Sequence, residues 1–147
     1  MAFAVSACSG YSGTSTAAKV HSWVAYNEFV ANHDRLIDDI SRATAAASHG
    51  SALQLRTVCA GMQFDIGTAY DTLPTPQESL TAALNTADQA LFKAGANCAR
   101  VASVHSARAK RALSQMAKAM QAFERVASLL RADGFIWRPT KSIARKG

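Results

Sequence analysis

Residues 55–98 read LRTVCAGMQFDIGTAYDTLPTPQESLTAALNTADQALFKAGANC, and they hold two apolar stripes separated by a Pro-x-Pro break. Within each stripe apolar residues recur every three or four positions, which places them on one face of a helix. Pro74 and Pro76 disfavour helical geometry in the residues that precede them. Thr75, Pro76 and Glu78 form a capping-box pattern that starts a new helix. The stretch therefore predicts two helices joined by a short turn.

Cys59 and Cys98 lie on these two stripes, one on each helix. From Cys59 the first helix rises ~20 Å to Thr72, and an extended turn can add ~10 Å. The second helix then descends ~31 Å to Cys98. The two cysteines arrive at nearly the same level on facing stripes, which permits a disulfide between the helices. The alternative is two separate buried thiols, since cysteine is a common core residue.

Two further helices are expected, one on each side of this pair. The first runs from about residue 14 to 47 and ends before Gly50, a residue suited to a left-handed helix cap. The last runs from about residue 105 to 132. A break near residues 102–106 is inferred because a helix that continued unbroken from Pro76 would be too long for a compact domain. The apolar stripe of the first helix is expected to contain Val20, Trp23, Tyr26 or Asn27, Val30, His33, Ile37 and Ile40.

Four amphipathic segments with short connections indicate an all-α fold. We expect an antiparallel up-down four-helix bundle with a disulfide between helices two and three. The alanine-rich, proline-poor composition favours helix, and no alternating segment is long enough to predict a strand. The 147 residues suit one domain. The expected organisation is a lipobox remnant and linker over residues 1–13, the bundle over 14–134, and a basic aromatic tail over 135–147.

The N-terminal segment Val5-Ser6-Ala7-Cys8 and the Gly/Ser-rich run after it resemble the lipobox of a bacterial lipoprotein. The resemblance implies a lipid on Cys8 and a mature chain tethered outside a membrane. Lipidation would also account for the odd cysteine among three. A signal peptide needs a basic region and roughly 7–15 apolar residues, so this interpretation places the true start upstream of Met1. The alternative is an ordinary N-terminus.

Charge is distributed unevenly along the chain. Residues 1–92 carry four Lys/Arg against eight Asp/Glu, whereas residues 93–147 carry twelve against two, a net +10. Such asymmetry predicts an electropositive face that meets an anionic partner. The alternative is that the acidic first half packs beside the basic second half and neutralises it. The expected anion-binding surface comprises Arg108, Lys110, Arg111, Lys118, Arg125, Arg131, Arg138 and Lys141.

The order of elements in residues 55–100 resembles small secreted or lipid-anchored helical proteins of actinobacteria. The shared elements are a Cys on one helix (Thr57-Val58-Cys59), the turn Leu73-Pro74-Thr75-Pro76, and a Cys that ends the next helix (Ala96-Asn97-Cys98). The resemblance implies the fold, export and the Cys59–Cys98 bridge, and it implies no chemistry. This chain departs from the group in its basic last helix and in Trp137.

Catalytic motifs are missing from the sequence. The four histidines show no H-x-x-x-H or E-x-x-H spacing, and no glycine-rich phosphate loop or G-x-S-x-G signature occurs. His33 and His105 could together grip a haem or metal, although core or boundary histidines are the simpler interpretation. Asp34, Asp38 and Asp39 are expected on a solvated face with Arg35 and Arg42. We expect no catalytic residue, no metal and no cofactor.

The sequence therefore favours a non-enzymatic lipoprotein of the cell envelope that binds or scaffolds through a basic face. Its expected partners are the membrane, by the lipid anchor, and an anionic lipid or envelope polymer. A second hypothesis is a cytosolic basic bundle that binds nucleic acid. A third is a carrier that holds an apolar ligand or haem between its helices.

Overall fold

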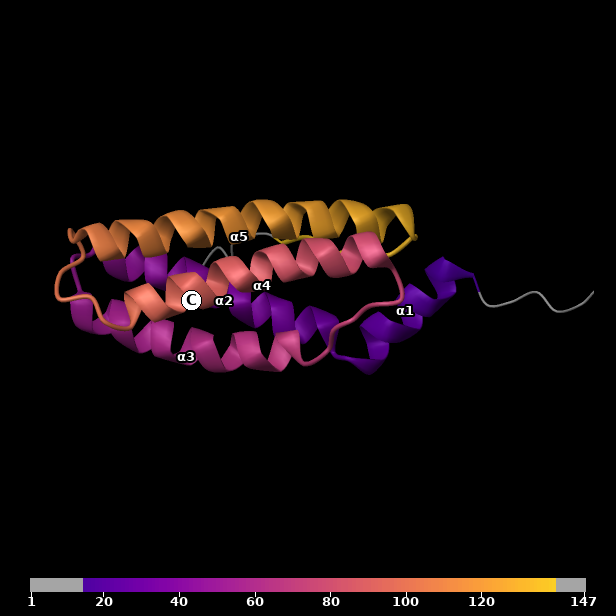
Figure 1. The fold of residues 1–147 in the computed structure, drawn as a ribbon, viewed down its shortest axis with the longest axis horizontal. Coiled ribbons are helices and arrows are strands. Elements are labelled where there is room, and N and C mark those ends of the chain that lie inside the picture. The colour runs from indigo at the N-terminus through magenta and orange to yellow at the C-terminus, as the bar shows by residue number, and fades with distance from the viewer. Residues whose placement is uncertain (1–14, 140–147) are drawn as a thin grey trace, which may run out of the picture.

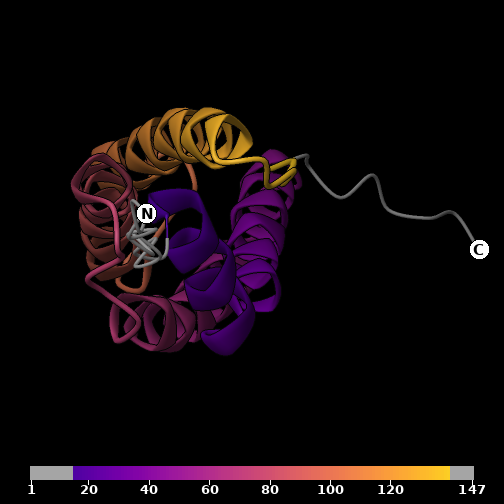
Figure 2. The same cartoon turned by 90° about the vertical axis from the view of Figure 1, so that its right-hand side faces the viewer.

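The computed structural model describes residues 15–139, which form five helices and no strand. The all-α prediction is confirmed, but the four-helix count is wrong. The helices are α1 (Thr16–Tyr26), α2 (Phe29–Ser48), α3 (Ala52–Tyr70), α4 (Glu78–Cys98) and α5 (Ala107–Ala132). The four long helices α2–α5 lie side by side, and the short α1 crosses one end of them (Figures 1 and 2).

The single helix expected over residues 14–47 is two helices, because the chain bends at Glu28. This residue is left-handed, with φ 49° and ψ 38°, and it separates α1 from α2. Polar side chains bond the carbonyls near the bend: the Asn27 amide donates to Trp23 O (2.9 Å), and the Asn32 amide donates to Asn27 O (3.0 Å). Val20 and Trp23 of α1 are buried at the end of the long helices.

Glycine at this bend is expected to stabilise the protein. A left-handed conformation costs a side-chain-bearing residue about 1–2 kcal/mol, and glycine avoids this cost at the expense of greater freedom in the unfolded chain. We expect Glu28→Gly to raise the free energy of unfolding, measured by urea titration, by about 0.5–1 kcal/mol. The matched control Glu78→Gly lies in the first turn of α4 and should destabilise instead. Destabilisation by Glu28→Gly would show that the Glu28 side chain itself supports the bend.

The turn between α3 and α4 differs from the predicted capping box. The Thr75 hydroxyl does accept from the Gln77 N–H (3.1 Å), as an N-cap would. Gln77, however, is extended (φ −124°, ψ 120°), so α4 begins at Glu78 without a side-chain cap. The Thr75 backbone N–H donates to the Thr81 hydroxyl (2.9 Å), which ties the turn to the first turn of α4.

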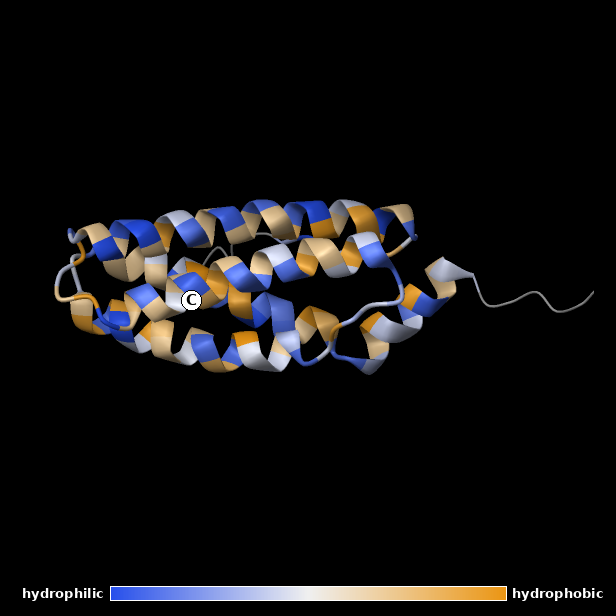
Figure 3. Cartoon of the chain, viewed as in Figure 1, coloured by the Kyte–Doolittle hydropathy of each residue, from blue (hydrophilic) through white to orange (hydrophobic). Residues whose placement is uncertain are grey.

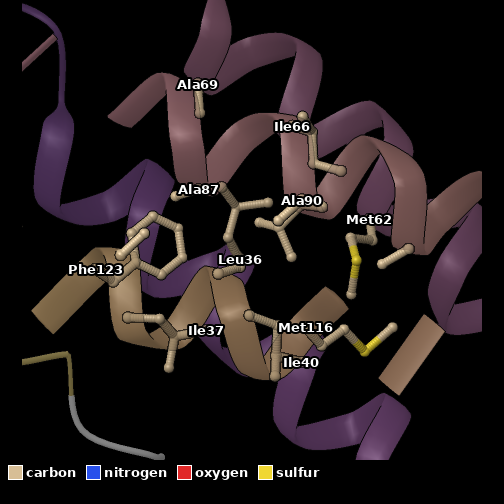
Figure 4. Packing of buried hydrophobic residues seen from close by; sticks show 14 of the residues in the cluster. Leu36, Ile37, Ile40, Met62, Ile66, Ala69, Ala87, Ala90, Met116 and Phe123 are labelled. Atoms are coloured by element: carbon tan, nitrogen blue, oxygen red, sulfur yellow. The ribbon is translucent and has the colours of Figure 1, made fainter. Parts of the chain in front are cut away.

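The core lies between the four long helices and includes the disulfide. Cys59 and Cys98 are bridged, with Cα atoms 5.8 Å apart, and both side chains are fully buried. The predicted bridge is confirmed; it joins α3 to α4, because the split of the first helix raises each later helix number by one. Figure 4 shows the surrounding packing, with Leu36, Ile37 and Ile40 from α2, Met62 and Ile66 from α3, Ala87 and Ala90 from α4, and Met116 and Phe123 from α5.

Candidate anion-binding surface

The basic residues are displayed by α5, the longest helix. Ser106 begins it as an N-cap whose hydroxyl accepts from the Ala109 N–H (3.1 Å). One stripe of α5 is buried, and most of it is alanine, which allows close packing against a neighbouring helix. The charged residues occupy the opposite side, and Figure 3 shows hydrophilic positions along the outer side of α5. The buried stripe comprises Ala109, Ala112, Met116, Ala119, Ala122, Phe123, Val126, Ala127 and Leu130.

Seven of the eight predicted anion-binding residues lie in the described part of the chain, and all seven are exposed. Six of them lie on α5, and Arg138 lies just after its C-terminal end. Lys141 lies outside the described residues. The six on α5 are Arg108, Lys110, Arg111, Lys118, Arg125 and Arg131.

The predicted alternative, mutual neutralisation of the acidic and basic halves, has no support in ion pairing. Between residues 15 and 139 the one salt bridge joins Arg42 to Asp39 (3.5 Å), and both belong to α2. No cation of α5 has a carboxylate within ion-pair distance in this part of the chain. Among residues 15–139, the exposed cations of α5 therefore face solvent without an ion-pair partner.

Two of these cations oppose the helix dipole. Arg108 and Lys110 lie in the first turn of α5, which contains no acidic residue, and Arg111 follows in the second turn. The N-terminus of a helix carries partial positive charge, so a cation there is unfavourable by about 0.3–1 kcal/mol. The helix dipole therefore disfavours the two cations of the first turn.

The chain after α5 is fixed to the bundle by Trp137. Its side chain is 4% exposed, and its ring packs edge-on against Phe29 and Phe123, with centroids 5.0 and 5.9 Å away. The indole N–H donates to Asp34 Oδ1 (3.0 Å). Trp137 thus packs against α2 and α5, and Arg138 follows it directly.

The two histidines considered for haem or metal are not brought together. His33 is buried, its Nδ1–H donates to Phe29 O (2.8 Å), and burial lowers its pKa to about 4. Its ring lies 5.7 Å from that of Phe123. Phe123 is ~24 Å along the axis of α5 from Ala107, the first residue of that helix, so His33 lies far from the start of α5. His105 is exposed just before α5. Nor do residues 15–139 contain any group of three His, Cys, Asp or Glu side chains able to hold a metal.

The burial of two carboxyl groups was not predicted from the sequence. Asp88 on α4 is 1% exposed, neither of its side-chain oxygens has a hydrogen-bond partner, and burial raises its pKa to about 7. Asp39, expected on a solvated face, is also buried; burial and the neighbouring Asp65 carboxyl raise its pKa. Asp88 follows Leu84 by four residues and precedes Leu91 by three, so the stripe spacing itself could have revealed it.

Comparisons with protein-family models, with curated proteins and with solved structures find no match for the chain. The resemblance to actinobacterial exported proteins therefore stays a prediction. Within residues 15–139 no helix combines the length and apolar character that crossing a membrane requires.

Proposed function

We propose that this protein is a non-enzymatic helical bundle that binds an anionic partner at the cell envelope through the exposed cations of α5. The observation that carries this proposal is the set of cations on α5 that are exposed, unpaired within the described chain and, at two positions, opposed to the helix dipole. Charge kept at a cost to stability is a reason to look for a binding role. Exposed cations attract anionic surfaces over distances of about 8 Å at physiological salt.

The envelope location draws on two features. The Cys59–Cys98 disulfide is compatible with an oxidising, extracytoplasmic compartment, where such bonds persist. Cys8, the proposed lipidation site, lies outside the described residues and would tether the bundle to a membrane. In that setting anionic lipids and anionic envelope polymers are the available partners, whereas the nucleic-acid alternative requires a cytosol in which disulfides are rare.

Removing the cations at the start of α5 is expected to weaken binding without weakening the fold. The triple variant Arg108→Gln/Lys110→Gln/Arg111→Gln should bind anionic vesicles or an anionic wall polymer roughly 3- to 150-fold less tightly at low salt, since exposed charge pairs contribute about 0.2–1 kcal/mol each. Its free energy of unfolding should stay level or rise, because the dipole repulsion is relieved. Co-sedimentation over a salt series and urea titration measure the two quantities.

Zwitterionic vesicles serve as the control, and neither protein should bind them. Wild-type binding should also weaken as salt rises, because exposed charges are screened. Binding that is unchanged in the triple variant and independent of salt would show that the charge only keeps the protein soluble.

A further inference from the structure

We propose, building on the proposed function, that the partner is a linear polyanion whose chain lies in the groove between α4 and α5. The groove has a volume of about 450 Å³ and is open to solvent. Its lining residues are Ser79, Ala82, Ala83 and Thr86 from α4, and Lys118, Gln121, Ala122 and Arg125 from α5.

The groove exists because small side chains line the seam between these helices. Ala82, Ala83 and Ala122 line the groove with small side chains. Lys118 and Arg125 provide its positive charge. Lys118 and Arg125 are seven residues apart, so they stand on the same face of α5, ~10.5 Å apart along its axis. Gln121, one turn from each, adds an uncharged amide donor between them.

The cations continue in a line beyond the groove itself. Arg111, Lys118 and Arg125 repeat every seven residues on α5, and successive members of such a row drift by only about 20° around the helix. On α4, Lys93 follows Thr86 by seven residues, so it stands on the groove side of that helix. All four side chains are exposed. A line of charges spaced along a helix axis matches an anionic chain that runs with the groove.

The surface lacks the features that a membrane or a single-stranded nucleic acid would use. Proteins that lie on membranes place large apolar side chains beside their cations, and proteins that bind single strands stack bases on aromatic rings. No exposed large hydrophobic residue lies on α5. Phe92 of α4 is exposed, but it does not line the groove, and its ring packs against that of Tyr70 on α3. The other exposed large hydrophobic residues of the described chain lie outside α4 and α5: Tyr26, Val30, Leu53, Phe64, Tyr70 and Ile136. Recognition here rests on charge and hydrogen bonding, which suits a flexible polymer of phosphate groups.

The decisive comparison uses linear polyphosphate, orthophosphate at equal phosphate concentration, and phosphatidylglycerol vesicles. We expect the wild-type protein to bind polyphosphate, to bind orthophosphate far more weakly, and to bind vesicles less tightly per accessible phosphate. Lys118→Gln/Arg125→Gln should lower polyphosphate affinity roughly 2- to 30-fold. It should also reduce the slope of log affinity against log salt by roughly 1.4, at about 0.7 for each lost phosphate contact. The matched control Lys19→Gln/Arg100→Gln removes equal charge outside the groove and should change both quantities little.

A second variant tests the groove without altering charge. Ala82 lines the groove and is exposed, so the larger side chain of Ala82→Leu would occupy part of the groove. We expect it to lower polyphosphate affinity while the salt slope stays unchanged and the melting temperature holds. Ala60→Leu, at an exposed alanine of α3 outside the groove, is its control.

The outcomes separate the groove from the wider proposal. Tighter binding to vesicles than to polyphosphate, or equal losses in the groove and control variants, would overturn the groove assignment and leave a diffuse basic face as the binding surface. Unaltered affinity in Ala82→Leu would likewise place the chain outside the groove. A wild-type protein that binds none of the three probes at low salt would overturn the proposed function together with this inference.

Discussion

Loss of the Cys59–Cys98 bridge, in Cys59→Ala/Cys98→Ala, is expected to lower the free energy of unfolding by about 4 kcal/mol. The two cysteines are 39 residues apart in sequence, and closing a loop of that length restricts the unfolded chain by about this amount. The Cα atoms, 5.8 Å apart, already fit an ordinary disulfide. The melting temperature should fall by roughly 10 °C or more. A double variant is chosen so that no unpaired thiol is left in the core.

Thermal and urea unfolding of the double variant, with Cys8→Ala as the control, measure this effect. Thiol titration of the unfolded wild-type protein, prepared under oxidising conditions, should find at most one reactive thiol, that of Cys8. Three reactive thiols, together with equal stability of the double variant, would show that the bridge contributes nothing to the fold.

Replacement of the buried Asp88 carboxyl is expected to stabilise the protein at alkaline pH. Burial raises the pKa of Asp88 to about 7, against about 3.9 in an unfolded chain. The folded state therefore keeps the proton on Asp88 up to a higher pH than the unfolded state does. The stability linked to this group is full below about pH 4 and is lost as pH rises through 7, by up to about 4 kcal/mol.

Asp88→Asn holds the site neutral at every pH. Its buried amide costs about 1–3 kcal/mol if it finds no partner, so we expect a net gain of about 1–3 kcal/mol at pH 8.5. Urea unfolding at pH 5, 7 and 8.5 measures the profile, with the exposed Asp71→Asn as the control. A profile parallel to that of the wild type would mean that Asp88 is ionised in the folded protein without cost.

His33 should oppose this trend at lower pH. Its folded pKa is lowered to about 4 by burial, so its linked stability is present above pH 6.5 and is lost as pH falls toward 4. Between about pH 4 and 6.5 His33 has the opposite slope to Asp88 and to Asp39, whose pKa is also raised. Asp88→Asn removes one of the two carboxyls that oppose His33, so acidification should change the stability of this variant less favourably than that of the wild-type protein.

The helical hairpin and its bridge could be predicted from the sequence because both depend on local spacing. The prolines and the apolar periodicity locate α3 and α4, and the level of each cysteine follows from helix rise alone. The bend at Glu28 could not be predicted, since neither proline nor glycine marks it and the apolar spacing runs through it. Tyr26, expected on the buried stripe, is 87% exposed because it lies just before the bend.

The candidate surface could be predicted in part. Cations on the polar side of an amphipathic helix are exposed almost by necessity, so the positions on α5 followed from its apolar stripe. The groove depends on how α4 packs against α5, which spacing within either helix does not specify. The burial of Asp39 also depends on helix packing, because Asp65, the neighbour of Asp39 on α2, belongs to α3.

Residue-resolved NMR during titration with linear polyphosphate tests most directly whether α5 is the binding surface. Backbone amide shifts should move first and furthest at Arg111, Lys118 and Arg125, and they should return to their free values as salt is raised. Shifts centred on α2 and α3, or no salt-reversible shifts at all, would contradict binding through the cations of α5.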